Sequence, residues 1–213
     1  MVAVSETRRR TEVLRILDRY LVEVVEKYTL CPWARMARER GEVQFEVLWG
    51  TPTVDTWVAS AEALFTRPNV QVVMVVAPEL VIRPGPLHNV RNDVSTRMQS
   101  VGIAEFHPEA PLDLASPARL VPYLRRSPDP LMQMVPLSIL ESVKGESQTA
   151  DRMHQVQALG GVAPPQRRDV GDRVAEDNHA TVTASHAAIT ATLEDIAADR
   201  RRSYELVGIN ASR

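Results

Sequence analysis

Apolar residues near the amino end of the chain recur every three or four positions. The series runs from Val13 to Tyr28. This is the spacing of a helix that buries one stripe of its surface, and it predicts a helix over residues 7–28. Pro32 suits the first turn of a shorter second helix, and Gly41 suits its exit. The chain is therefore expected to begin with two helices in succession.

Three further segments carry the hydrophobic pattern of strands. Residues 43–47 alternate between apolar and polar side chains, residues 70–77 are almost wholly apolar, and residues 101–106 form a third short segment. Apolar steps of three and four between them predict helices over residues 53–65 and 87–100. This alternation implies βαβ crossovers. The predicted fold class is α/β, or α+β, with a small, mainly parallel sheet of three to four strands, helices packed on it and a further C-terminal helix.

The last part of the chain is richer in proline and polar residues. Residues 117–140 are expected to be helical in pieces, because prolines interrupt them repeatedly. The polar stretch from Pro164 to Asn178 predicts a linker. The expected organisation is a single α/β domain over residues 1–160, a linker over residues 161–178 and a C-terminal helix over residues 179–213. That helix is expected to dock on the body or on another subunit, as in a homo-oligomer.

The charge balance argues against nucleic acid as a partner. The 213 residues carry 25 Lys and Arg against 27 Asp and Glu, a formal net charge of −2, whereas general nucleic-acid binders are basic. The arginine triplets at 8–10 and 200–202 are accordingly interpreted as solvated helix ends. The longest apolar run, residues 72–77, is far shorter than the ~20 residues that span a bilayer. The amino end shows no apolar signal segment, so we expect a cytoplasmic protein with no membrane partner.

A single cysteine, Cys31, excludes a disulfide within the chain and any multi-cysteine metal site. At the start of a helix its thiolate would be stabilised by unpaired backbone amides, which suits a nucleophile, a redox sensor or a thiolate ligand. The alternative is a small buried hydrophobic residue. Trp33, two positions on, either lines an apolar pocket or belongs to the core.

His107 and the segment Arg125-Arg126-Ser127 are the other candidates for chemistry. His107 ends a predicted strand, and the carboxyl ends of parallel strands line the usual ligand crevice of open sheets. An imidazole there can ligate a metal or heme iron, act as a general base, or simply cap the strand and hydrogen-bond a loop. The arginine fork binds carboxylates or phosphates, and the serine adds a donor. The arginine–serine segment therefore suits a heme propionate or the carboxylate of an amino-acid substrate, and the alternative is a solvated surface pair of arginines.

Three short motifs, Leu30-Cys31-Pro32-Trp33-Ala34, Phe106-His107-Pro108-Glu109 and Arg126-Ser127-Pro128-Asp129-Pro130, occur in a characteristic order. The chain between Tyr20 and Lys144 resembles the bacterial domain-of-unknown-function family fourteen-fifteen, whose pattern runs LCPFA, FHPD and NRSPYP. Trp33 stands where that family has phenylalanine, and Asp129 where it has tyrosine. Gln133 and Pro136 stand where the family continues with histidine and arginine, so no role of that histidine is carried over. The family is in turn similar to the heme-containing amino-acid N-oxygenases.

The leading functional prediction follows from the resemblance and from the lack of other cofactor motifs. The chain has no Walker A loop, no GxGxxG, no HExxH and no GxSxG. We predict a heme-dependent oxygenase or peroxygenase that binds heme b and acts on a small amine or amino acid. Its site would comprise His107 as axial iron ligand, Cys31 and Trp33 lining the cavity, and Arg126 and Ser127 holding a carboxylate. The alternatives are a cofactor-free enzyme with a Cys31–His107 nucleophile–base pair, and a non-catalytic binding or assembly protein.

Overall fold

A mixed four-stranded sheet forms the centre of the molecule. The computed structural model describes residues 5–142 and 170–210. The strand order is β1-β2-β4-β3; β1 pairs with β2 in parallel, and β4 is antiparallel to both of its neighbours. Three strands therefore run the same way, as predicted, with one reversed strand inserted between them. The strands are β1 (Val43–Val47), β2 (Val72–Val76), β3 (Val101–Phe106) and β4 (Leu131–Pro136).

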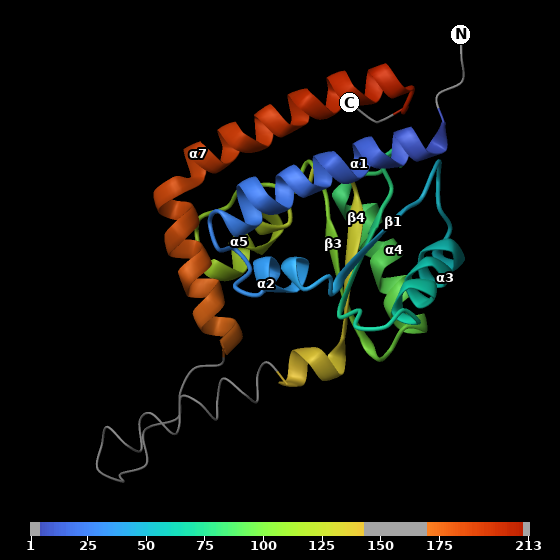
Figure 1. Cartoon of the computed structure of the whole chain (residues 1–213). Helices are drawn as coiled ribbons and strands as arrows, with labels where there is room; N and C mark the ends of the chain where they lie inside the picture. The colour runs from blue at the N-terminus through green and yellow to red at the C-terminus, as the bar shows by residue number, and fades with distance from the viewer. Residues whose placement is uncertain (1–4, 143–169, 211–213) are drawn as a thin grey trace.

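Helices cover both faces of this sheet (Figure 1). On one face lie α3 (Val54–Phe65) and α4 (Pro84–Arg97). The other face is covered by α1 (Glu6–Tyr20), η1 (Leu21–Glu26), α2 (Ala34–Glu39), α5 (Pro117–Leu124) and α7 (Val170–Val207).

Alternation along the strands divides the core into two layers. On β2, Val73 and Val75 pack under α3 and α4, whereas Met74 and Val76 pack under α1 and η1. Successive strand side chains point to opposite faces, so an apolar strand such as β2 is buried on both sides. The predicted α+β architecture with a C-terminal helix is confirmed.

Local sequence signals set several helix ends. The side chains of Ser5, Thr53 and Ser116 each accept a hydrogen bond from a backbone N–H in the first turn of α1, α3 and α5, which is the usual N-cap arrangement. Gly41 follows α2 with φ of +70°, a left-handed conformation that glycine adopts readily. The predicted exit of the second helix at this glycine is confirmed, although that helix begins at Ala34 rather than Pro32.

The prediction of helical pieces over residues 117–140 is wrong for part of that segment. α5 and residues 137–140 are helical as expected, whereas residues 131–136 form the strand β4. The prolines exclude helix interiors, but Pro130 lies just before the strand and Pro136 is its last residue, so neither interrupts the strand interior. The short apolar run between them completes the sheet.

The C-terminal helix begins earlier than predicted. Residues 170–178, expected to belong to the linker, form the first part of α7, while residues 161–169 lie outside the described residues. Asn178 is buried, and its Nδ2 donates to the Leu30 carbonyl at 3.0 Å. This contact explains why a polar segment is helical here: it packs on the body of the same chain. Homo-oligomerisation through α7 stays a prediction.

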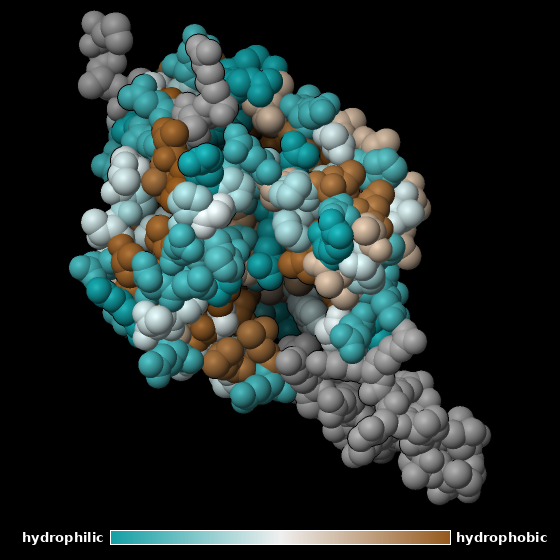
Figure 2. All heavy atoms as spheres, turned by 180° about the vertical axis from the view of Figure 1, so that it is seen from behind, coloured by the Kyte–Doolittle hydropathy of each residue, from teal (hydrophilic) through white to brown (hydrophobic). Residues whose placement is uncertain are grey.

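An ion-pair seam joins α7 to α1, which run side by side (Figure 1). The Asp199 carboxylate accepts hydrogen bonds from Arg15 at 2.8 and 3.1 Å and from Arg19 at 2.8 Å. The Arg15 guanidinium, together with Arg19, lowers the pKa of Asp199 to about 2. Although α7 is long, no helix in the described residues has the apolar stretch needed to cross a membrane. The molecular face in Figure 2 shows apolar residues scattered in small groups among polar ones.

Candidate functional site

An apolar cavity lies between the sheet and the segment that follows α1. We call it the η1 cavity; it has a volume of about 270 Å³ and is lined by η1, α2 and residues of all four strands. Ligand pockets of roughly 300–1,000 Å³ with apolar walls and few polar groups are typical of small-molecule sites. The volume of the η1 cavity lies just below that range.

A π-helical turn forms one wall of this cavity. The backbone N–H of Lys27 donates to the Val22 carbonyl at 3.2 Å, a five-residue step. Such π turns are rare and occur frequently at functional sites. The wider turn brings Leu21, Val25 and Glu26 to the cavity. The sequence pattern predicted helix here but not its π geometry.

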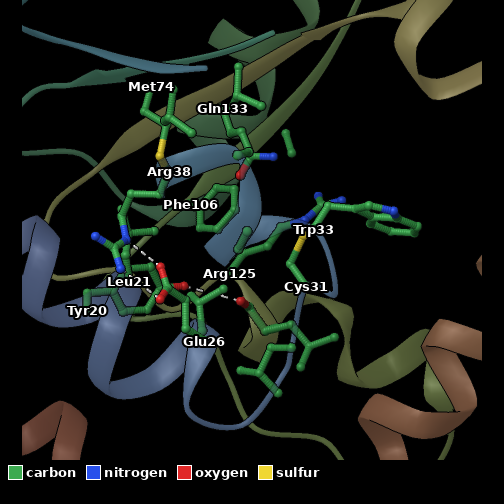
Figure 3. Close-up of a pocket in the computed structure, with 18 residues that line it drawn as sticks. Tyr20, Leu21, Glu26, Cys31, Trp33, Arg38, Met74, Phe106, Arg125 and Gln133 are labelled. Carbon is green, nitrogen blue, oxygen red and sulfur yellow. Dashed lines mark hydrogen bonds and ion pairs between the residues drawn. The ribbon is translucent and has the colours of Figure 1, made fainter. Parts of the chain in front are cut away.

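The acidic side chain of that wall is neutralised by its neighbour. The Glu26 carboxylate accepts two hydrogen bonds from Arg38, at 2.6 Å from Nε and 3.0 Å from Nη2, and Figure 3 shows the pair at one end of the cavity. The paired Arg38 guanidinium lowers the pKa of Glu26. Glu26 is therefore an ionised but fully engaged carboxylate.

The sheet side of the cavity carries one polar residue between apolar neighbours. Gln133 of β4 pairs in register with Met74 on β2 and with Ala104 on β3, and all three line the cavity. Figure 3 shows the Gln133 carboxamide projecting into it. The side chain is half-buried, and among the described residues it has no hydrogen-bonding partner.

Cys31 and Trp33 both line the η1 cavity, on the opposite side from the Glu26–Arg38 pair (Figure 3). Burial raises the pKa of the Cys31 thiol, against the opposing effect of the Trp33 and Ala34 backbone amides. The thiol form is therefore favoured, contrary to the low-pKa thiolate considered from the sequence. Trp33 remains 37% exposed. It is thus part of the cavity wall rather than of the core.

Arg125 borders the same cavity. Burial lowers the pKa of its guanidinium. Its nearest acidic group is Glu105, whose Oε2 lies 3.9 Å from Nη1 and is already bonded to Arg91 at 3.1 Å. A loosely paired cation thus lies at the edge of a mainly apolar space.

His107 lies outside the η1 cavity and has both ring nitrogens engaged. Its Nδ1 accepts from the Glu109 backbone N–H at 3.0 Å, which leaves the ring proton on Nε2, and Nε2 donates to the Ile82 carbonyl at 2.8 Å. The residue is 6% exposed. Neither nitrogen has a free lone pair for iron or for a substrate proton. This geometry agrees with the alternative given by the sequence, in which His107 caps the strand and hydrogen-bonds a loop.

The Ser127 side chain is also engaged in a hydrogen bond within the protein. Its Oγ donates to the Asp129 carbonyl at 2.5 Å, and the side chain is buried. Arg126 lines a separate hollow beside His107, described below. The predicted residues are thus divided: Cys31 and Trp33 line the η1 cavity, and Arg126 and His107 line the other hollow.

A buried cluster that sequence reasoning missed joins the RSPDP motif to α7. Asp129, 1% exposed, accepts from Arg200 Nε at 2.7 Å and from the Tyr204 hydroxyl at 2.6 Å. Arg200 is 6% exposed, so the interpretation of residues 200–202 as a solvated helix end is wrong for Arg200. The four-residue spacing of Arg200 and Tyr204, which places both side chains on one face of a helix, is the sequence signal that could have identified this cluster.

The residues present do not fit a heme held by His107, because both imidazole nitrogens are already hydrogen-bonded. The thiol–imidazole pair is not assembled either, since Cys31 and His107 line different hollows. Within residues 5–142 and 170–210, no group of three or more His, Cys, Asp or Glu side chains is arranged to hold a metal ion. Heme binding by any other route stays an untested prediction.

Comparison of the chain with protein-family models, with curated proteins and with solved structures gave no match. The resemblance of the three motifs to family fourteen-fifteen therefore stays a prediction.

Proposed function

We propose that the protein binds a small, mainly apolar organic molecule in the η1 cavity, with the polar group of that molecule held by Gln133. The observation that carries the proposal is the carboxamide of Gln133, which projects from a central strand into an apolar space without a protein partner in the described structure. A ligand that hydrogen-bonds the Gln133 carboxamide offsets the free-energy cost of removing that carboxamide from water.

The position of Gln133 supports a binding role. Its side chain is half-buried, and a ligand that filled the cavity would remove the carboxamide from water, so that a ligand without a hydrogen-bonding group there would leave it unsatisfied at a cost of roughly 1–3 kcal/mol. Gln133 occupies the position where the resembled family has a histidine. A polar group at this point of the cavity is what a ligand site requires and a plain core does not.

The charges around the cavity favour an acid or an amide over an amino acid. Arg125 at its edge suits a carboxylate, because a guanidinium donates to both oxygens of one. An ammonium group would need a free carboxylate. Among the described lining residues the acidic side chain is Glu26, and it is bound to Arg38. We therefore infer a ligand with an apolar body and a carboxylate or amide head.

Cys31 serves as a reporter in this proposal rather than as a nucleophile. Burial raises the pKa of its thiol, so little of the reactive thiolate forms at neutral pH. The chain has no other cysteine. The rate at which N-ethylmaleimide modifies the protein therefore measures access to the η1 cavity.

The test uses octanoate and octanamide as probes, with isothermal titration calorimetry and Cys31 modification as readouts. We expect at least one probe to bind and to slow modification severalfold. Gln133→Leu should weaken binding about tenfold or more, because the polar contact is lost, while the free energy of unfolding is unchanged or rises by about 1 kcal/mol. Gln99→Leu, at an exposed position, is the matched control and should change neither.

Two results would contradict the proposal. One is a wild-type protein that binds neither probe and shows unprotected Cys31 modification. The other is Gln133→Leu binding both probes as tightly as the wild type, which would show that the carboxamide contributes nothing to recognition.

A further inference from the structure

A second hollow lies at the carboxyl ends of β2 and β3, and we call it the strand-end crevice. It has a volume of about 700 Å³ and is formed by the loop after β2, the loop after β3, the segment before β4 and one face of α7. The outer edge of a sheet beyond the carboxyl ends of its parallel strands is where open α/β proteins usually bind ligands. The strand-end crevice therefore occupies a position typical of ligand sites, and the charges that line it indicate which ligand it suits.

Three arginines from three separate segments line the crevice. Arg83 comes from the loop after β2, Arg126 from the segment before β4 and Arg201 from α7. None of them has a carboxylate partner among the described residues. The acidic side chain lining the same crevice is Glu109, which is exposed and makes no described ion pair.

Several other arginines of the molecule are paired with acidic side chains. Arg15 and Arg19 share Asp199, and Arg38 binds Glu26. Arg200, which also lines the crevice, is neutralised by Asp129 at 2.7 Å. Arg83, Arg126 and Arg201 differ from these examples in lining the crevice without such an acid among the described residues.

Arg126 is held in a defined orientation. Its Nε donates to the Pro108 carbonyl at 3.0 Å, and the side chain is half-buried. No acceptor among the described residues bonds its two terminal nitrogens. Because one edge of the guanidinium is fixed by the loop, the remaining donors are preorganised for an external acceptor.

We propose that the strand-end crevice binds a small molecule bearing a phosphate group. Arg83, Arg126 and Arg201 carry three positive charges and Glu109 carries one negative charge, so the crevice has a net charge of about +2. The Arg200–Asp129 ion pair adds no net charge. A phosphate monoester carries about −1.5 to −2 charge at neutral pH, which matches that excess, whereas a single carboxylate does not. Guanidinium groups bind phosphate oxygens in bidentate fashion.

This inference is independent of the proposed function. The η1 cavity and the strand-end crevice share no lining residue. Loss of octanoate binding therefore says nothing about phosphate, and loss of phosphate binding says nothing about octanoate.

The test measures binding of inorganic phosphate and of glycerol 3-phosphate to the full chain by calorimetry at low ionic strength, with acetate as the carboxylate comparison. We expect both phosphates to bind and acetate to bind at least tenfold more weakly. Arg126→Gln and Arg201→Gln should each weaken glycerol 3-phosphate binding at least fivefold. Arg202→Gln is the matched control, because Arg202 is an exposed neighbour on α7 that does not line the crevice, and it should change affinity less than twofold.

Several outcomes would overturn the inference. They are a wild type that binds neither phosphate, equal binding of acetate, and an Arg202→Gln variant weakened as much as Arg201→Gln, which would indicate general charge attraction. Binding to phosphatidic acid vesicles without binding to glycerol 3-phosphate would replace the small-molecule ligand by a lipid surface. Arg201 is exposed, so its variant keeps the test valid if Arg126→Gln fails to fold.

Discussion

The η1 cavity and the strand-end crevice are built from neighbouring residues but have opposite chemistry. Phe106 and Arg125 line the cavity, whereas the next residues, His107 and Arg126, line the crevice. The two motif loops are joined where the His107 backbone N–H donates to the Arg125 carbonyl at 3.0 Å. Phe106 is the last residue of β3, and successive residues there point to opposite sides; Arg125 caps the end of α5, and the chain leaves the helix at Arg126. One pair of segments therefore contributes to an apolar space and to a cationic one.

Hydrogen-bond pairing distinguishes structural polar groups from ligand-binding ones in this protein. Asp129, just before β4, has its carboxylate bonded to Arg200 and to Tyr204. Gln133, within β4, has no described partner. A buried polar group with all its bonds made stabilises the fold, whereas one facing a hollow without a partner is available to a ligand. Three comparisons between variants test how paired and unpaired positions differ.

The largest effect is expected where a paired cation is removed. Arg200→Met leaves the Asp129 carboxylate buried without its ion-pair partner, and breaking such a pair costs about 3–5 kcal/mol. Arg202→Met, at an exposed position on the same helix, should stay within about 0.5 kcal/mol of the wild type. Urea unfolding followed by circular dichroism measures both. Equal stability of the two variants would show that the buried cluster is not needed to hold α7.

A middle-sized difference in stability is expected between a larger side chain placed in the core and the same side chain placed in the η1 cavity. Ala61 of α3 is 0% exposed and belongs to the core under the sheet, so Ala61→Leu is expected to destabilise by about 1–3 kcal/mol through overpacking. Ala104→Leu places the same extra atoms in the η1 cavity. It should cost less than about 1 kcal/mol and abolish octanoate binding. An equal loss of stability in both variants would mean that the cavity is not open space.

The smallest effect concerns a paired charge at the surface and depends on pH. The folded pKa of Asp199, about 2, lies below its ordinary value of 3.8, so its stabilising contribution is complete above about pH 4 and is lost as the pH falls toward 2. Solvent screening limits the contribution to on the order of 1 kcal/mol. The stability difference between wild type and Asp199→Asn should therefore shrink between pH 5 and pH 2.5. A difference that stays constant over this range would contradict the role of the carboxylate in the α1–α7 seam.

Much of the fold could be predicted from local pattern. The strand over residues 43–47 and the strand over residues 101–106 have the predicted bounds, because alternation and β-branched runs report directly on strand geometry. The strand β4 could not be identified in the same way. Its flanking prolines were interpreted as helix interruptions, and only pairing with β2 and β3 distinguishes a short apolar run as a central strand.

The candidate site was predicted only in part. The sequence singled out Cys31, Trp33 and Arg126, and each of them lines a hollow. It noted Gln133 only as a departure from the family pattern and gave it no role. Arg83 was not recognised because an exposed arginine in a loop has no distinguishing local signal.

The local pattern of the sequence was enough to predict the order of the elements up to β3, the exit of α2 at Gly41 and the burial of β2 on both faces, since these depend on residues close together in the chain. The folded arrangement was needed to show that His107 is fully hydrogen-bonded, that Asn178 and Arg200 are buried, and that Gln133 faces a cavity. The reason is physical: each of these properties depends on a partner, or on the lack of one, supplied by segments far apart in the chain.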